Sequence, residues 1–202
     1  MQIISMLLSA IVQVLIFSLI PFIWWFFTDR KQLSFLKWIG LKKTIVENKR
    51  KYIISFIIIL FFFTVLFISV PFLVKNADAA TSQFSGQGIK ALIPALIYAF
   101  LQTGLSEEIF FRGFLAKRLI GKFGFKVGNT VQGILFGLLH GIMFISSTGL
   151  FRAIIIIIFT GILGSLMGWI NEKQSGGSII PSWLLHGIAN TCASIIAMFS
   201  LI

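Results

Sequence analysis

The chain is a succession of long apolar stretches separated by short polar segments. A helix needs about 20 mostly apolar residues to cross the hydrocarbon core of a membrane, because it rises about 1.5 Å per residue. Six stretches meet that length, and they cover residues 3–27, 52–74, 89–115, 127–146, 150–170 and 179–201. The pattern therefore predicts an all-α fold, a polytopic transmembrane helical bundle of about six spans.

Composition supports lipid as the solvent for most side chains. Hydrophobic residues make up 57% of the chain and charged residues only 11%, whereas a soluble domain carries about 25% charged residues. The net charge of +11 comes from lysines and arginines that lie mainly between the apolar stretches. Membrane topology and anionic lipid headgroups explain this charge, so nucleic-acid binding is set aside. We expect an integral, multi-pass cell membrane protein.

The lysines and arginines also predict an orientation. They concentrate in segments 30–51 and 117–126 and recur at Lys173, on the side where the odd-numbered spans end. The positive-inside rule places these segments in the cytoplasm and both termini outside. Segment 30–51 also contains Phe35 and Trp38, so it is either a helix lying in the inner interface or an ordinary basic loop.

Small residues recur at helical spacing on two neighbouring spans. Gly133, Gly137 and Gly141 fall every fourth residue on the fourth span, and Gly164 and Gly168 do so on the fifth. Small residues at this spacing let helix backbones approach closely in lipid. The pattern predicts close packing of these two spans.

Ionisable residues inside the spans stand out against this background. Glu107 and Glu108 lie within the third span, and both histidines of the chain, His140 and His186, lie within later spans. An ionisable group at the bilayer centre costs roughly 2.5–3.5 kcal/mol even on insertion scales, so function is the default hypothesis. The alternatives are a structural ion pair for the glutamates and interhelical hydrogen bonds for the histidines.

Helical spacing assigns these residues partners. Glu108 and Arg112 are four residues apart and can form an ion pair, which leaves Glu107 free to point elsewhere. The same spacing places Asn190 beside His186, and Phe136 as a wall beside His140. The four candidate catalytic residues lie roughly 10–20 Å from the inner ends of their spans at 1.5 Å per residue. We expect them to meet in one cavity that faces the cytoplasm.

These groups can be combined into a hydrolytic site. Peptide hydrolysis needs a base that activates water and donors that stabilise the oxyanion. Glu107 with His140 can activate water, and His186 with Asn190 can supply the donors. No serine has a nearby His–Asp pair, and Cys192 has no evident partner, so nucleophilic catalysis is disfavoured.

The three motifs E-E-x-x-x-R (107–112), F-x-x-x-H (136–140) and H-x-x-x-N (186–190) occur in this order on three spans. In this they resemble the CPBP family of CAAX proteases and bacteriocin-processing enzymes, also called the Abi family. The resemblance covers about residues 90–202. It implies a four-helix peptidase core at 89–202, preceded at 1–88 by two transmembrane helices with a basic cytoplasmic or interfacial loop.

The resemblance implies a glutamate-dependent intramembrane endopeptidase. Glu107 and His140 would activate the water, His186 and Asn190 would form the oxyanion hole, and Glu108 and Arg112 would support the site. The substrate would be a membrane-associated peptide or protein, as in bacteriocin or pheromone maturation or in self-immunity, in a bacterial plasma membrane. The alternative is a non-catalytic immunity or scaffold protein that uses the same fold; a proton-coupled transporter is less consistent with a chain that has no repeat.

A metal is the remaining open question of the sequence. Two histidines and two glutamates, His140, His186, Glu107 and Glu108, could bind zinc. However, the H-E-x-x-H pattern is absent, and an asparagine such as Asn190 is a poor zinc ligand. We therefore expect no cofactor, with zinc as the alternative.

Overall fold

The computed structural model describes residues 2–73 and 80–201, and it describes side chains for 3–66 and 80–201. The described residues form helices and connecting turns, with no strand among them. The elements are α1 (Gln2–Thr28), α2 (Phe35–Trp38), α3 (Lys49–Leu73), the 3₁₀ helices η1 (Ala80–Phe84) and η2 (Gly88–Ala91), α4 (Leu92–Leu96), the π-helices η3 (Ile97–Leu105) and η4 (Glu108–Ala116), α5 (Lys117–Thr148), α6 (Leu150–Gln174) and α7 (Ile180–Met198). The chain is a helical bundle, as predicted.

Membrane-spanning length is met by four helical segments of the described chain. They are Ile3–Thr28, Gly88–Thr148, Leu150–Gln174 and Ile180–Met198. The second segment contains both the third and the fourth predicted spans, which are separated at Gly124, where the backbone leaves the helical region with φ 78° and ψ 164°. This left-handed φ suits glycine, and it reverses the chain between the two spans. The second predicted span, 52–74, corresponds to α3. The last residue of that predicted span, Val74, lies outside the described residues.

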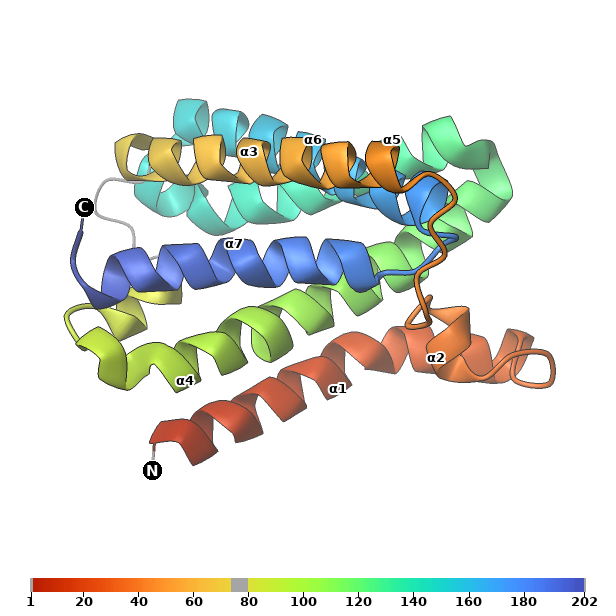
Figure 1. Cartoon of the computed structure of the whole chain (residues 1–202), viewed down its shortest axis with the longest axis horizontal. Helices are drawn as coiled ribbons and strands as arrows, with labels where there is room; N and C mark the ends of the chain where they lie inside the picture. The colour runs from red at the N-terminus through yellow and green to blue at the C-terminus, as the bar shows by residue number, and fades with distance from the viewer. Residues whose placement is uncertain (1, 74–79, 202) are drawn as a thin grey trace.

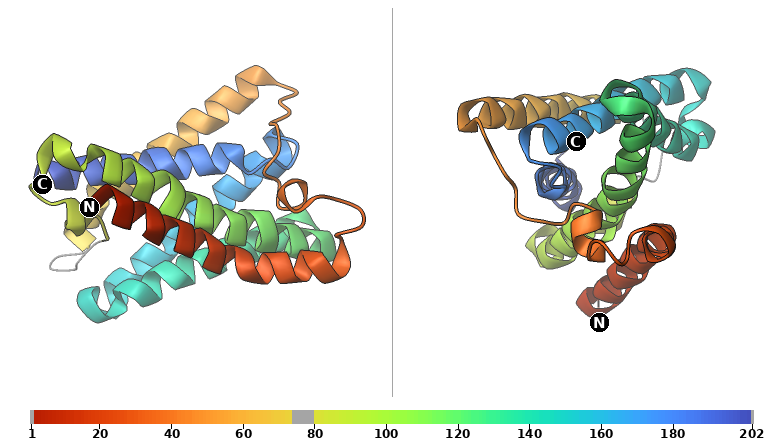
Figure 2. Two further views of the ribbon diagram at one scale, coloured as in Figure 1. Left: turned by 90° about the horizontal axis from the view of Figure 1, so that it is seen from below. Right: turned by 90° about the vertical axis from the view of Figure 1, so that its right-hand side faces the viewer.

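The two N-terminal helices lie on different sides of the remaining bundle (Figures 1 and 2). Helix α1 runs along η3 and η4, whereas α3 runs across α6 and α7. Ile59 and Phe63 of α3 are buried against Met167 of α6 and Leu185 of α7. Most of α1, by contrast, keeps its apolar side chains exposed, as expected for a helix in contact with lipid.

The glycine pattern marks the closest helix contact, between α5 and α6. A Cβ at Gly133 would collide with Ser165 and the Gly161 carbonyl, and a Cβ at Gly141 would collide with Ile157. The prediction of close packing is confirmed. The sequence pattern missed Gly161, which lies opposite Gly133 and lets the two backbones meet.

The lysine-rich segment folds back over one end of the bundle. Helix α2 has only four residues, and Trp38 and Ile39 are buried against a core that includes Phe114 and Ile179. The Ile179 amide donates a 2.9 Å hydrogen bond to the Gly40 carbonyl, which ties this segment to the α6–α7 loop. Trp38 thus packs into the protein core, whereas Leu33 and Leu36 of the same segment stay exposed, so a place in the inner membrane interface remains a prediction.

Asp29 anchors the start of this segment. Its carboxylate accepts hydrogen bonds from Thr28 Oγ1 and from Trp38 Nε1, each 2.7 Å long, and Arg118 Nη1 lies 3.5 Å away. The Thr28 bond, then the Trp38 bond and the charge of Arg118, hold the pKa of Asp29 below its usual value. An ionised Asp29 therefore holds the α1–α2 turn against the start of α5.

Candidate functional site

The segment that carries the two glutamates has an unusual backbone. Ser106 and Glu107 form a short α-helical link between two nine-residue π-helices, η3 and η4. π-helical segments are rare and occur frequently at functional sites, because they change the direction in which successive side chains point. Here Glu107 points into a cavity, whereas Glu108 is fully buried in the protein core.

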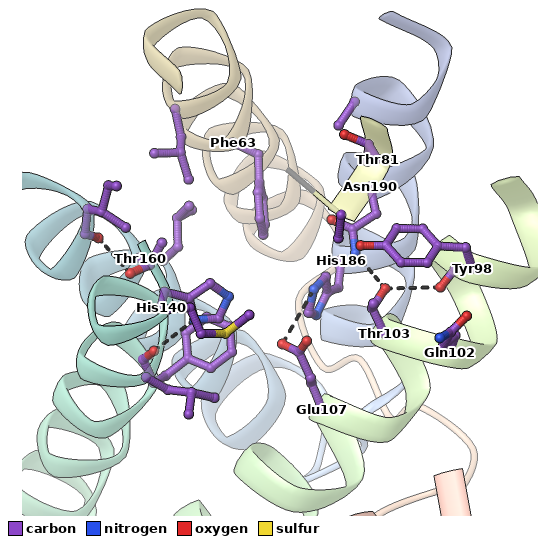
Figure 3. A pocket seen from close by; sticks show the side chains of 18 of the residues that line it. Phe63, Thr81, Tyr98, Gln102, Thr103, Glu107, His140, Thr160, His186 and Asn190 are labelled. Carbon is purple, nitrogen blue, oxygen red and sulfur yellow. Dashed lines mark hydrogen bonds and ion pairs between the residues drawn. The ribbon is translucent and has the colours of Figure 1, made fainter. Parts of the chain in front are cut away.

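A cavity of about 480 Å³ lies inside the bundle and is lined by five of the predicted site residues (Figure 3). These residues are Glu107, Phe136, His140, His186 and Asn190. They come from the η3–η4 link, from α5 and from α7, as the motif order predicted. The structure thus brings together side chains from three segments that are 28 or more residues apart in the chain.

Glu108 and Arg112 lie behind the cavity wall and do not line it. Their ion pair, predicted from the spacing, is present: Arg112 Nη1 lies 3.1 Å from Glu108 Oε1, and both side chains are at most 1% exposed. The Ser182 hydroxyl donates to the other oxygen of Glu108 and accepts a 2.7 Å hydrogen bond from Asn171 Nδ2. Partners on η4 and α7 therefore hold Glu108, and Asn171 of α6 holds the Ser182 hydroxyl in turn; this suits a supporting role better than a catalytic one.

His186 lies between the two glutamates. Its Nδ1 is 3.2 Å from Glu108 Oε1, and its Nε2 is 3.8 Å from Glu107 Oε2. A carboxylate on one ring nitrogen fixes the orientation of an imidazole and presents the other nitrogen to a ligand. The buried Glu108 thus aims Nε2 of His186 at the cavity and at Glu107.

His140 faces His186 and Glu107 across the cavity (Figure 3). Its Nδ1 makes a 2.9 Å hydrogen bond with the Phe136 carbonyl, and the His140 and Phe136 ring centroids are 4.4 Å apart. The Arg112 guanidinium also lies over the Phe136 ring, with its Cζ 4.0 Å from the ring centroid. Phe136 therefore walls the site as predicted and also links the buried ion pair to His140.

Asn190 is fixed by a residue that the sequence analysis did not single out. Its Nδ2 donates a 2.8 Å hydrogen bond to Thr103 Oγ1, and that hydroxyl donates in turn to the Tyr98 carbonyl at 3.0 Å. Thr103 lies four residues before Glu107, so helical spacing offered a signal. Ser182, four residues before His186, gave a similar one, whereas Asn171 could be found only from the helix packing.

The cavity extends in the direction opposite to the one predicted. Its lining reaches Thr81 and Gln83 of η1 and Phe144 near the end of α5. Neither of the lysine-rich segments 30–51 and 117–126, which the structure describes in full, contributes a lining residue. The buried Glu108–Arg112 cluster and the folded-back α2 segment fill that end of the bundle. The prediction of a cavity facing the lysine-rich end is therefore wrong.

The arrangement does not fit the zinc alternative. Among the described residues, no group of three or more His, Cys, Asp or Glu side chains is gathered closely enough to hold a metal ion. Both oxygens of Glu108 are engaged by Arg112, Ser182 and His186, so neither is free to bind a metal ion. Glu108 is therefore not placed to complete a zinc site with the other three proposed ligands.

Comparison with known proteins agrees with the motif resemblance. The family model for type II CAAX prenyl endopeptidases of the Rce1-like group matches residues 89–192, about half of the chain. That range contains every predicted site residue, and it begins after α1 and α3. No curated protein and no solved structure gave a match. On its motifs, its helical architecture and this match, the chain belongs to the Rce1-like family of type II CAAX prenyl endopeptidases.

Proposed function

We propose that this protein is an intramembrane endopeptidase in which Glu107 activates the attacking water. The observation that carries this proposal is the environment of the Glu107 carboxylate. Its Oε2 is buried at the cavity wall and makes no hydrogen bond among the described residues. His186 Nε2 lies 3.8 Å from this oxygen, while the adjacent Glu108 is fully engaged. A carboxylate oxygen that lines a cavity and makes no hydrogen bond can accept a proton from a water molecule, so Glu107 is suited to act as a general base.

The reaction would proceed by direct attack of water on the scissile carbonyl carbon. Glu107 accepts one proton from the water, and His140, on the facing wall, helps to position that water. The oxyanion accepts hydrogen bonds from Asn190 Nδ2 and from an N–H at His186 Nε2, while Nδ1 of the same ring lies 3.2 Å from Glu108 Oε1. Protonated Glu107 then gives its proton to the leaving amine as the C–N bond breaks, which yields a carboxylic acid and an amine; the acid then loses its proton to solvent.

The proposed substrate is a membrane-associated peptide or protein in a bacterial plasma membrane, of the kind processed in bacteriocin or pheromone maturation or in self-immunity. Support comes from the cavity, which lies within the bundle and is lined mostly by apolar residues. We also propose that anionic lipid headgroups contact the lysine-rich segment 30–51, and that no metal takes part. Retention of activity with 1,10-phenanthroline is the expected result, and zinc-reversible inhibition contradicts it.

The substitution Glu107→Gln tests the catalytic assignment. Removing a general base is expected to lower the rate by about 10²–10⁴-fold, because the amide cannot accept the water proton. The measurement uses purified protein in proteoliposomes with a library of quenched-fluorescent transmembrane peptides, and mass spectrometry locates the cut. Membrane abundance of the variant should match that of the wild type.

A non-catalytic immunity or scaffold role predicts a different outcome. In that case the wild type cleaves no peptide in the library, and Glu107→Gln leaves the cellular phenotype unchanged. Cleavage that persists in Glu107→Gln, at the same site and rate, also overturns the assignment of Glu107 as the base.

A further inference from the structure

The cavity has two walls of different chemistry. On the α1 and η3 side it presents amides and a hydroxyl, which belong to Gln13, Gln102 and Thr103. On the α3, α5 and α6 side it presents large apolar side chains, which belong to Phe63, Leu139, Met143, Leu163 and Met167. His140 lies on the second side and faces Glu107 and His186 across the cavity (Figure 3). The mechanism above uses none of the groups on Gln13 or Gln102.

A membrane peptide cannot be cut while it is helical. Its scissile carbonyl is then bonded within the helix and covered by side chains, so a turn must unwind to reach Glu107. Unwinding exposes backbone N–H and C=O groups, and each unpaired group costs several kcal/mol away from water. The four catalytic residues are occupied by the water and the oxyanion. Other groups must therefore pair the substrate backbone on either side of the scissile bond.

Gln13 and Gln102 have the chemistry for this task. Gln102 Nε2 donates a 3.3 Å hydrogen bond to Gln13 Oε1, which holds the two amides side by side across the α1–η3 contact. Gln102 Oε1 is buried and has no hydrogen-bond partner among the described residues. Each amide also carries a second N–H, so the pair offers an acceptor and donors together. An unwound peptide needs that combination.

We propose that Gln13 and Gln102 form a backbone-binding subsite for the unwound segment of the substrate. A substrate N–H donates to Gln102 Oε1, and a nearby substrate carbonyl accepts from an amide N–H of the pair. A large apolar side chain beside the scissile bond then packs on the opposite wall of the cavity. The substrate class is thus an apolar membrane segment recognised by its backbone at the polar wall. This inference rests on the proposed endopeptidase function.

Only one of the two glutamines lies in the segment that the family model matches. Helix α1 lies outside the family match at 89–192, whereas Gln102 lies within it, five residues before Glu107. The neighbouring apolar residues of α1, such as Val12 and Leu15, are exposed. The simpler role for a pair of glutamines is an interhelical hydrogen bond that holds α1 in place. The two roles differ in what they predict for substrate binding.

The test uses the fastest-cleaved peptide of the library and a series of its analogues in which one backbone amide at a time is replaced by an ester. Each ester removes a single N–H donor. Gln102→Leu is expected to raise KM about tenfold, equivalent to about 1.4 kcal/mol, with kcat within about twofold. One ester near the cut should raise KM for the wild type by a similar factor and leave KM of Gln102→Leu unchanged. Gln13→Leu removes the hydrogen bond that orients the Gln102 amide, so it should show the same loss of sensitivity.

Ser9→Leu is the matched control, because Ser9 is exposed on the same helix; it should leave KM unchanged. Thermal unfolding of all variants identifies any loss of fold, and Gln13→Leu carries the test if Gln102→Leu is unstable. The subsite is overturned if KM is unchanged in both glutamine variants. It is also overturned if the ester raises KM of these variants by the same factor as for the wild type. Cleavage that survives Glu107→Gln instead overturns the catalytic proposal, so the two failures are distinguishable.

Discussion

Glu108→Gln is expected to destabilise the folded protein by about 3–5 kcal/mol, the range for removing one partner of a buried ion pair. Arg112 would remain in the core with its main counter-charge gone, and the hydroxyl of Ser182 would face an amide. Unfolding followed by tryptophan fluorescence in detergent micelles measures this loss. Lower abundance in the membrane should accompany it.

Glu107→Gln is the matched control, because it makes the same chemical change one residue away. Glu107 lines the cavity with 15% of its side chain exposed, so its stability change should be well under half of that for Glu108→Gln. The double variant Glu108→Gln/Arg112→Met removes the unpaired cation and should be more stable than Glu108→Gln alone. Equal destabilisation by the two glutamate variants, or strict additivity in the double variant, contradicts the assignment of Glu108 to the buried ion pair and of Glu107 to the cavity.

Gly137→Ala is expected to destabilise the protein by about 1–3 kcal/mol through overpacking. The added Cβ would lie 3.0 Å from the Gly161 nitrogen and closer still to the Ile157 carbonyl oxygen. Both are backbone atoms of α6, so relief requires the two helices to separate. His140 lies less than one helical turn beyond Gly137 on α5, and peptide cleavage should therefore fall together with stability.

Gly121→Ala, also in α5, is expected to change the stability in the opposite direction to Gly137→Ala. No atom lies within 4 Å of a Cβ built at Gly121, and alanine is favoured over glycine inside a helix by about 0.5–1 kcal/mol. Gly121→Ala should thus raise thermal stability and leave cleavage unchanged. If Gly137→Ala and Gly121→Ala shift the unfolding transition in the same direction, the close contact of α5 and α6 does not limit stability.

Features that depend on neighbours in the chain could be predicted from the sequence. The apolar stretches predicted the helices, the glycine repeats predicted the α5–α6 contact, and the spacing of Glu108 and Arg112 predicted their ion pair. Polar groups inside the spans also identified four residues that line one cavity, and helical spacing added Phe136. All of these arise from local geometry or from the cost of placing a residue type in lipid.

Contacts between distant segments were decided by the tertiary structure. The π-helices around Glu107 set the direction of its side chain, and helix packing placed Thr103 against Asn190 and Ser182 against Glu108. The lysine-rich segment could not be predicted to fold inward, because its aromatic residues suit a lipid interface as well as a core. Helix packing also decided toward which end of the bundle the cavity extends. Apolar and basic patterns specify which residues avoid water, but only the crossing of the helices specifies which end of the bundle they fill.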